Sequence, residues 1–182
     1  MFEDSENYRE RVISKWLTLH AKPFEENKTQ QIYHFIKTLD YVISIAKDPG
    51  GFIPVVCQYR IPCDSVTFEF PAGLVESNES PQDAAVRELL EETGLEACSP
   101  PIHVTSLFPE PGRLRNRVHI YFFPKTYYSS VSCEGGLTVQ LYSESHLPNL
   151  MLDNSFSNAV HHAAYLQASL RGYLSITSKN YL

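Results

Sequence analysis

Residues 73–95 read GLVESNESPQDAAVRELLEETGL, and this stretch predicts the central helix of the fold. Ser80 is a suitable hydroxyl N-cap, and Pro81 suits the first helical position. Apolar residues then recur at helical spacing, at Ala85, Val86, Leu89 and Leu90. Gly94 supplies the left-handed residue at which helices commonly stop. We therefore expect a helix from about residue 81 to residue 93.

Three carboxylates share one face of this expected helix. Glu88 and Glu92 are four residues apart, and Glu91 is three residues from Glu88, so the side chains lie one above another. An ordinary solvated face, with Arg87 paired to Glu91, is the alternative interpretation. Like charges at this spacing cost a few tenths of a kcal/mol per pair unless a cation compensates them. Oxygen ligands of this kind suit Mg2+ or Mn2+ better than zinc.

The same stretch resembles the Nudix box, G-x5-E-x7-R-E-U-x-E-E-x-G-U, in which U is an aliphatic residue. Every defined position is filled, by Gly73, Glu79, Arg87, Glu88, Leu89, Glu91, Glu92, Gly94 and Leu95. The resemblance implies an α+β fold, the Nudix α/β/α sandwich, with a mixed sheet packed between helices. It also implies a metal-dependent hydrolase that acts on a nucleoside diphosphate linked to another group.

The resemblance assigns roles to the residues of the box. The expected ligands of Mg2+, or of Mn2+, are Ala72 through its carbonyl, Glu88 and Glu92. These cations would neutralise the diphosphate and polarise phosphorus for attack by water. The residues expected to be structural are Gly73, Glu79, Arg87 and Gly94, with Arg87 joining the loop to the helix through ion pairs.

Motifs outside the box are similar to one branch of the family. CQYRIP (57–62) and FEFPAGLVE (68–76) resemble the ADP-ribose and ADP-sugar pyrophosphatases, and Pro111 stands where that branch has a proline. KWLTL (15–19) and IYHFIK (32–37) are similar to the eukaryotic members. The leading hypothesis is therefore Mg2+-dependent hydrolysis of ADP-ribose to AMP and ribose 5-phosphate by a homodimer.

The branch implies a set of substrate-binding residues. Two aromatic residues from different subunits stack on the adenine in those relatives, and they map to Trp16 and Tyr33; a core tryptophan and a strand tyrosine are the alternatives. Such stacking contributes ~1–3 kcal/mol per base. Arg60 is expected to bind phosphate as a two-pronged donor, with a surface ion pair as the alternative. Leu74 is expected near the ribose or base, and Glu110 at a sugar hydroxyl.

The catalytic base is expected on a loop after the box. Glu134, in SCEGGLTV, is the only acidic residue between Glu110 and Glu144, and two glycines follow it. Those glycines would let a loop close, so Glu134 is the candidate for base or third metal ligand, and Glu91 is the alternative.

Two positions depart from the family pattern. Asn116 stands near a position where many bacterial members have an acid, and Thr38 stands where eukaryotic relatives have an arginine at the terminal phosphate. Lys37 is the candidate replacement for that arginine. Substrate choice is therefore less firmly indicated than reaction type. A UDP-sugar or other nucleoside-diphosphate-linked substrate remains open, as does a catalytically inactive nucleotide-sugar sensor, although the complete box favours an enzyme.

The remaining segments predict an α+β domain. Short runs rich in Ile, Val, Tyr and Phe predict strands at 31–38, 41–47, 51–60, 102–108, 117–123 and 137–142. AKPFEENK (21–28) is expected to be a turn, and 155–170 a second amphipathic helix. Residues 1–40 are expected to form an extension for dimer and adenine contacts, and 41–182 the hydrolase domain. His161 and His162 are sequence neighbours, so their side chains diverge and do not share a metal.

Composition bounds the possible partners. The chain has 182 residues, of which 43% are apolar and 20% charged, which fits one folded domain with a short extension. The formal charge of −6 argues against nucleic-acid binding, and six acids against one base place −5 of it in residues 73–95. The acidic N-terminus is unlike a signal peptide, and no apolar run approaches the ~20 residues that cross a bilayer. We therefore expect no membrane partner and a cytoplasmic or nuclear location.

Overall fold

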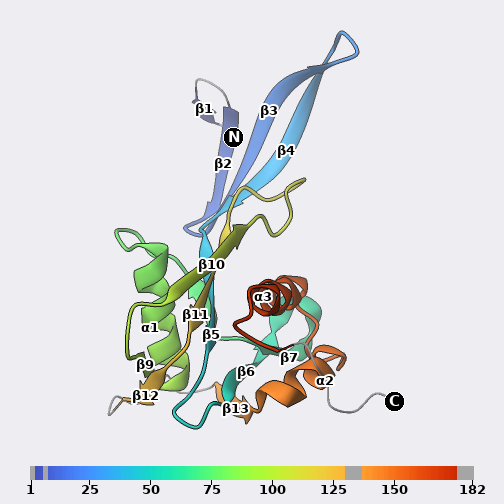
Figure 1. The fold of residues 1–182 in the computed structure, drawn as a ribbon. Coiled ribbons are helices and arrows are strands. Elements are labelled where there is room, and N and C mark those ends of the chain that lie inside the picture. Colours follow the sequence, from blue (N-terminus) through green and yellow to red (C-terminus); the bar gives the residue numbers. More distant parts are fainter. Residues whose placement is uncertain (1–2, 6–7, 130–136, 176–182) are drawn as a thin grey trace. The chain divides into compact units, whose positions relative to one another are not determined.

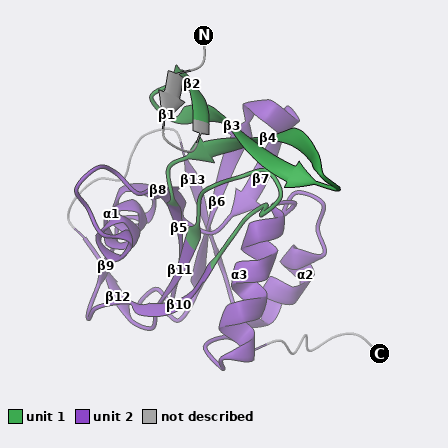
Figure 2. Cartoon of the chain, turned by 90° about the horizontal axis from the view of Figure 1, so that it is seen from above, with its two compact units in different colours: residues 1–40, 107–118 green, residues 41–106, 119–182 purple. Residues whose placement is uncertain are grey.

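The chain folds into two compact units, coloured separately in Figure 2. The computed structural model describes residues 3–5, 8–129 and 137–175. Unit 1 comprises residues 1–40 and 107–118, and unit 2 comprises residues 41–106 and 119–182. Unit 1 therefore combines the N-terminal segment with a segment about seventy residues farther along, which the sequence did not indicate.

Unit 1 is built on an antiparallel sheet in the order β1-β2-β3-β4 (Figure 1). Its strands are β1 (Glu3–Ser5), β2 (Tyr8–Ser14), β3 (Leu17–Glu26) and β4 (Thr29–Thr38). Asn27 and Lys28 connect β3 to β4 with φ values of 50° and 62°. Two left-handed residues in succession are typical of the hairpin turn whose twist matches that of the strands. The later segment joins β4 at Ile36, whose N–H donates to the carbonyl of Arg113 at 2.8 Å.

The expected turn over residues 21–28 is confined to Asn27 and Lys28, because β3 continues to Glu26. Pro23 and the polar residues after it suggested a loop. Pro23 lies beyond the part of β3 that pairs with β2, which ends at the Arg9–Ala21 pair, and it faces Ile32 of β4 on the other side. Among the described residues no β2 residue pairs with Pro23, and a proline is tolerated at such a position because its missing N–H breaks no ladder bond there.

Unit 2 holds almost all of the other strands. They are β5 (Tyr41–Ala46), β6 (Ile53–Arg60), β7 (Ser65–Glu69), β8 (Ala72–Leu74), β9 (Leu95–Ala97), β10 (Ile102–Leu107), β11 (Val118–Phe123), β12 (Thr126–Tyr128) and β13 (Thr138–Tyr142). One sheet has the order β10-β11-β5-β8, and a second has the order β13-β6-β7. A two-stranded sheet pairs β12 with β9.

In the part of the chain that the structure describes, three α-helices cover these strands. They are α1 (Pro81–Thr93), α2 (Leu147–Met151) and α3 (Ala159–Leu170). In unit 2, α1 lies on one side of β5 and β11, and α2 and α3 lie on the other (Figures 1 and 2). This arrangement confirms the expected sandwich of sheets between helices. The C-terminal helix begins later than expected, because the Asn158 side chain caps it by accepting from the N–H of Val160.

The predicted helix over residues 81–93 is confirmed, with both of its ends. The Ser80 hydroxyl accepts from the N–H of Asp83 at 3.2 Å, which satisfies one of the free donors of the first turn. Gly94 has a φ of 71° and donates its N–H to the carbonyl of Leu90 at 2.8 Å. Both signals are local, so the sequence alone could specify them.

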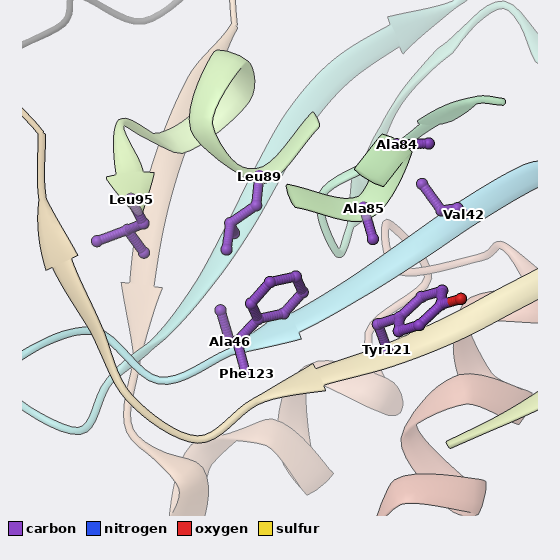
Figure 3. Close-up of a cluster of buried hydrophobic side chains, with 8 residues drawn as sticks. All are labelled: Val42, Ala46, Ala84, Ala85, Leu89, Leu95, Tyr121 and Phe123. Atoms are coloured by element: carbon purple, nitrogen blue, oxygen red, sulfur yellow. The ribbon is translucent and has the colours of Figure 1, made fainter. Parts of the chain in front are cut away.

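A buried apolar cluster fixes α1 against the first sheet of unit 2. Its members come from α1, β5, β9 and β11, as Figure 3 shows: Val42, Ala46, Ala84, Ala85, Leu89, Leu95, Tyr121 and Phe123. Small residues of α1 let the helix approach β5 closely, and Leu89 fills the space between them. The cluster thereby sets which way the acidic face of α1 points.

Within the described residues, no helix combines the length and the apolar character needed to span a bilayer.

Candidate active site

Arg87 lies at the centre of a group of carboxylates. Its Nη1 donates to Glu88 at 2.8 Å and to Glu91 at 2.9 Å, and its Nη2 donates to Glu79 at 2.8 Å. Nη2 also donates to the carbonyl of Leu74 at 3.0 Å. The hydrogen bond with Glu79, followed by those with Glu88 and Glu91, raises the pKa of Arg87 above its ordinary value. One guanidinium thus joins the loop before α1 to the helix, as the expected structural role requires.

Glu92 is a carboxyl group buried at the face of α1 that meets β8. Its side chain is buried, and its Oε2 accepts from the N–H of Ala72 at 2.9 Å. Burial raises the pKa of Glu92 to about 8, and the nearby charge of Glu88 adds to that increase. A carboxylate at this place is therefore unfavourable unless positive charge is brought to it.

Gly73 allows the second carboxylate to reach the same place. A Cβ on Gly73 would lie 2.0 to 2.2 Å from the carboxyl atoms of Glu88, so no other residue fits without displacing that side chain. Glu88 and Glu92 therefore converge on the backbone of β8, beside Ala72.

The donor set fits a divalent cation. Two carboxylates and a backbone carbonyl are hard oxygen ligands, and because burial raises the pKa of Glu92, a cation bound there would stabilise its charged form. Within the described residues, no three His, Cys, Asp or Glu side chains are grouped to hold a metal. The third ligand expected from the sequence is the backbone carbonyl of Ala72, and Glu134, the other candidate, lies outside the described residues.

A pocket of about 220 Å3 opens beside this strand. Its lining comes from β5, β6, β7, β8 and the start of α3: Tyr41, Arg60, Glu69, Ala72, Gly73, Leu74, Asn158 and His161. The pocket brings together three residues that the sequence indicated from two separate motifs, Arg60 from CQYRIP and Ala72 and Leu74 from FEFPAGLVE. Arg60 presents a cation, and the glycine and alanine of β8 leave room for a ligand. Such a space suits an anion that also contacts a metal on the carboxylates.

Arg60 is held by a bidentate ion pair. Its Nε and Nη2 donate to the two carboxylate oxygens of Glu69 at 2.9 and 2.7 Å. The Arg60 side chain is 40% exposed, whereas that of Glu69 is 5% exposed. The ion pair considered as an alternative to phosphate binding is thus present, but it is anchored on a buried partner and leaves Arg60 open to the pocket. Burial raises the pKa of Glu69, but hydrogen bonds from Arg60 and Thr67 with the charge of Arg60 lower it overall.

His161 lies behind Glu69 and is fully buried. Its Nδ1 accepts from the N–H of Phe70 at 3.0 Å, so in the neutral ring the proton resides on Nε2, 3.3 Å from Glu69 Oε2. Burial lowers the pKa of His161 to about 4. Sequence reasoning considered His161 only as a metal ligand and missed its place beside Glu69, because the two residues are far apart in the chain.

The two candidate adenine-binding aromatics lie in unit 1. Trp16 is 53% exposed, which excludes the core tryptophan considered as its alternative, and Lys15 Nζ lies 4.3 Å from the centre of its ring. Tyr33 on β4 donates its hydroxyl proton to the carbonyl of Gly112. A pocket of about 340 Å3 lies beside Tyr33, lined also by Phe35, Phe108, Pro111, Gly112, Arg113, Leu114 and Arg115.

Two of the other expected residues of unit 1, Glu110 and Thr38, have local partners. Glu110 accepts from the N–H of Gly112 at 3.0 Å, so it supports its own loop. The Thr38 hydroxyl donates to the carbonyl of Leu39 at 3.3 Å. Asn116 is buried, and its Oδ1 has no hydrogen-bond partner within the described part of the chain. Lys37 is exposed.

Of the two candidates for the catalytic base, only Glu91 lies within the described residues. Glu134 lies outside the described residues. Glu91 lies on α1 with its side chain 39% exposed, and its Oε2 accepts from Arg87 at 2.9 Å. Which of the two acts on the attacking water stays a prediction.

Comparisons with known proteins agree with this geometry. A family model described as the NUDIX domain matches residues 37–144. An ADP-sugar pyrophosphatase of Mus musculus is 50% identical over 52 residues, which cover 26% of this chain and 24% of that protein. A GDP-mannose pyrophosphatase of Yersinia enterocolitica is 31% identical over 140 residues, which cover 68% of this chain and 70% of that protein.

A solved structure shows the same fold. The crystal structure of an ADP compounds hydrolase has a TM-score of 0.77 and 20% sequence identity, over 93% of this chain and 95% of that one. Matches to curated relatives often span less than two thirds of the relative, at 42%, 24% and 62% of the length in three cases.

Proposed function

Because the chain belongs to the Nudix family, we propose that it is a Mg2+-dependent hydrolase of ADP-ribose, or of ADP-sugars. It would cleave the diphosphate bond of ADP-ribose to give AMP and ribose 5-phosphate. The observation that carries the proposal is the pair of carboxylates at β8, Glu88 and buried Glu92, beside a pocket that contains Arg60. The mouse relative, which is named an ADP-sugar pyrophosphatase, supports adenine as the nucleobase of the substrate.

In this proposal the metal site comprises Glu88, Glu92 and the carbonyl of Ala72. Mg2+ bound there would neutralise the carboxylates and the diphosphate and would polarise phosphorus. Mn2+ fits the same oxygen donors. Arg87 keeps the loop and α1 together, so that both carboxylates stay on one side of the ligand.

Arg60 would bind a phosphate of the substrate. Its pair with Glu69 uses Nε and Nη2, and Nη1 has no partner among the described residues. A half-exposed guanidinium with a fixed plane is suited to phosphate, because its side chain loses little conformational entropy when phosphate binds. Leu74 would pack near the ribose, and Glu91 or Glu134 would position the attacking water.

Trp16 and Tyr33 would hold the adenine in a homodimer, in which the N-terminal strands of one subunit complete the site of the other. The exposed ring of Trp16 and the pocket beside Tyr33 support this part of the proposal. Glu110 would accept from a sugar hydroxyl. A second candidate is a nucleotide sugar with another base, which the similarity to a GDP-mannose pyrophosphatase favours.

A substrate panel tests the proposal. The protein is incubated with ADP-ribose, UDP-glucose, GDP-mannose and a diadenosine polyphosphate, each with Mg2+ and with EDTA, and the products are separated by chromatography. We expect the fastest turnover for ADP-ribose, to AMP, and none with EDTA. Faster turnover of GDP-mannose or UDP-glucose would assign the second candidate, and no turnover of any substrate would overturn the hydrolase and favour the sensor.

A further inference from the structure

Arg60 belongs to a chain of contacts that extends from the pocket into the core of unit 2. Ser65, Thr67 and Glu69 lie on one face of β7, and Arg60 pairs with Ser65 in the ladder of β6 and β7. The Thr67 hydroxyl donates to Glu69 Oε1 at 2.7 Å, and Arg60 Nε donates to the same oxygen. The other oxygen, Oε2, receives Arg60 Nη2 and faces the Nε2 of His161.

The orientation of His161 is fixed on every side. The N–H of Phe70 holds its Nδ1, and its ring lies near those of Phe70 and Phe156, at centroid distances of 6.1 and 6.3 Å. Asn158, which caps α3, sets the start of the helix that carries His161. The imidazole is therefore held in place, with its Nε2 3.3 Å from Oε2 of Glu69, the oxygen that also holds Arg60.

We propose that His161 is a positioning residue for Arg60, acting through Glu69 to hold the guanidinium in the orientation that binds a phosphate of the substrate. This inference rests on the proposed function, because it assumes that Arg60 contacts a diphosphate. The contact with His161 restricts the Glu69 carboxylate, and the carboxylate restricts the plane of the guanidinium. Without the His161 contact, the Arg60 side chain would lose conformational freedom each time a ligand binds, and this entropy cost weakens binding.

The alternative is that His161 only packs the core. Leucine has a similar volume and would keep the packing but lose both hydrogen-bonding nitrogens. Glutamine would keep a donor for Glu69 and an acceptor for the N–H of Phe70. A leucine and a glutamine variant therefore separate the two roles, provided that both fold.

The test is a double-mutant cycle with ADP-ribose and Mg2+. We expect His161→Leu to raise KM roughly tenfold with little change in kcat, and His161→Gln to restore most of the loss. Loss of folded protein would instead lower kcat in proportion to the active fraction and leave KM unchanged. In an Arg60→Ala background, His161→Leu should change KM less than about twofold, because its effect passes through Arg60.

His162→Leu is the matched control. His162 lies on the same helix and its Nε2 contacts the carbonyl of Phe156 at 2.6 Å, outside the pocket. It should leave KM unchanged. Thermal unfolding of each variant checks that the fold is intact at the assay temperature.

The outcomes separate this inference from the proposed function. A tenfold rise in KM from His161→Leu in both backgrounds overturns the positioning role, because the residue then acts independently of Arg60. So does a failure of His161→Gln to restore KM. If the parent hydrolyses no substrate, the proposed function fails, and the same cycle is read from the binding of inorganic pyrophosphate with Mg2+ by calorimetry. If Arg60→Ala changes neither KM nor pyrophosphate binding, the positioning role is overturned.

Discussion

The two units differ in how far their candidate functional side chains are exposed to solvent. In unit 2, Glu69, Glu92 and His161 are buried, and each is fixed by hydrogen bonds to the backbone or to neighbouring side chains. In unit 1, three large side chains are exposed: Trp16 in the turn between β2 and β3, and Ile32 and Tyr33 on β4. A buried polar network is complete within its own unit, whereas an exposed apolar sheet can gain by being covered. The first arrangement suits chemistry and the second suits contact with another molecule.

The largest expected effect comes from removing one carboxylate of the pair Glu88 and Glu92. Glu92→Gln should lower kcat by about 10³-fold, because a neutral amide no longer compensates a divalent cation. Its stability should not fall, since the amide can still accept from the N–H of Ala72 and burial favours a neutral group at this place. Turnover of ADP-ribose and the thermal midpoint are the measurements. The control is Glu96→Gln, an exposed carboxylate on β9 that pairs with Tyr127. Equal rates for Glu92→Gln and the parent would sink the assignment.

Acid should weaken unit 2 through His161. Its pKa is about 4 in the folded chain and 6.5 when unperturbed, so between these values the unfolded chain binds one more proton. Stability is therefore lost as the pH falls from about 6.5 to about 4, by up to about 3 kcal/mol. Urea unfolding at pH 7 and pH 4.5 measures the loss, which His161→Gln should reduce.

The chain has one tryptophan, Trp16 in unit 1, so its fluorescence compared with circular dichroism shows whether the units unfold separately. An equal loss in the parent and the glutamine variant would contradict this explanation.

Removing the exposed ring in unit 1 should affect binding and not folding. Trp16→Ala should raise the KM for ADP-ribose roughly tenfold, since stacking on a base contributes ~1–3 kcal/mol. A uridine substrate should be affected less, because its smaller ring stacks more weakly. Ile32→Ala is the control, an exposed side chain on β4 beside Tyr33 in the sequence. A large drop in the thermal midpoint of Trp16→Ala would show that the ring supports the fold instead.

The smallest effect is expected at the hairpin between β3 and β4. Lys28 has a φ of 62°, which costs a residue with a side chain more than it costs glycine. Lys28→Gly should therefore stabilise the protein by about 0.5–1 kcal/mol, and Lys28→Ala, which keeps the strain, should not. Urea unfolding measures both variants. No gain from glycine would show that the turn does not limit the stability of unit 1.

Local signals account for what the sequence predicted well. The ends of α1 depend on Ser80, Pro81 and Gly94, which act within one helical turn, and the box places Glu88 and Glu92 on one face of it. The turn expected over residues 21–28 was too long because the tolerance of Pro23 depends on which strand edges are paired. The short helix α2 has five residues, too few for a periodic pattern.

The support behind Arg60 could not be predicted for a different reason. Glu69 and His161 meet through the packing of α3 on the second sheet, and no spacing in the sequence records that contact. FEFPAGLVE contains Glu69, but the motif did not single this residue out or indicate its partners. The site residues in the box were therefore accessible from the sequence, and those that hold them in place were not.

The missing side chain at Gly73 has a consequence for how the protein tolerates change. One hydrogen atom there determines the clearance between a strand and the Glu88 carboxylate, since a methyl group would lie about 2 Å from it. Any larger residue at position 73 would act as a wedge that moves α1 or turns Glu88 aside, while leaving the apolar cluster beneath the helix intact. Such a protein would fold normally and still be unable to bring its two carboxylates to the same point.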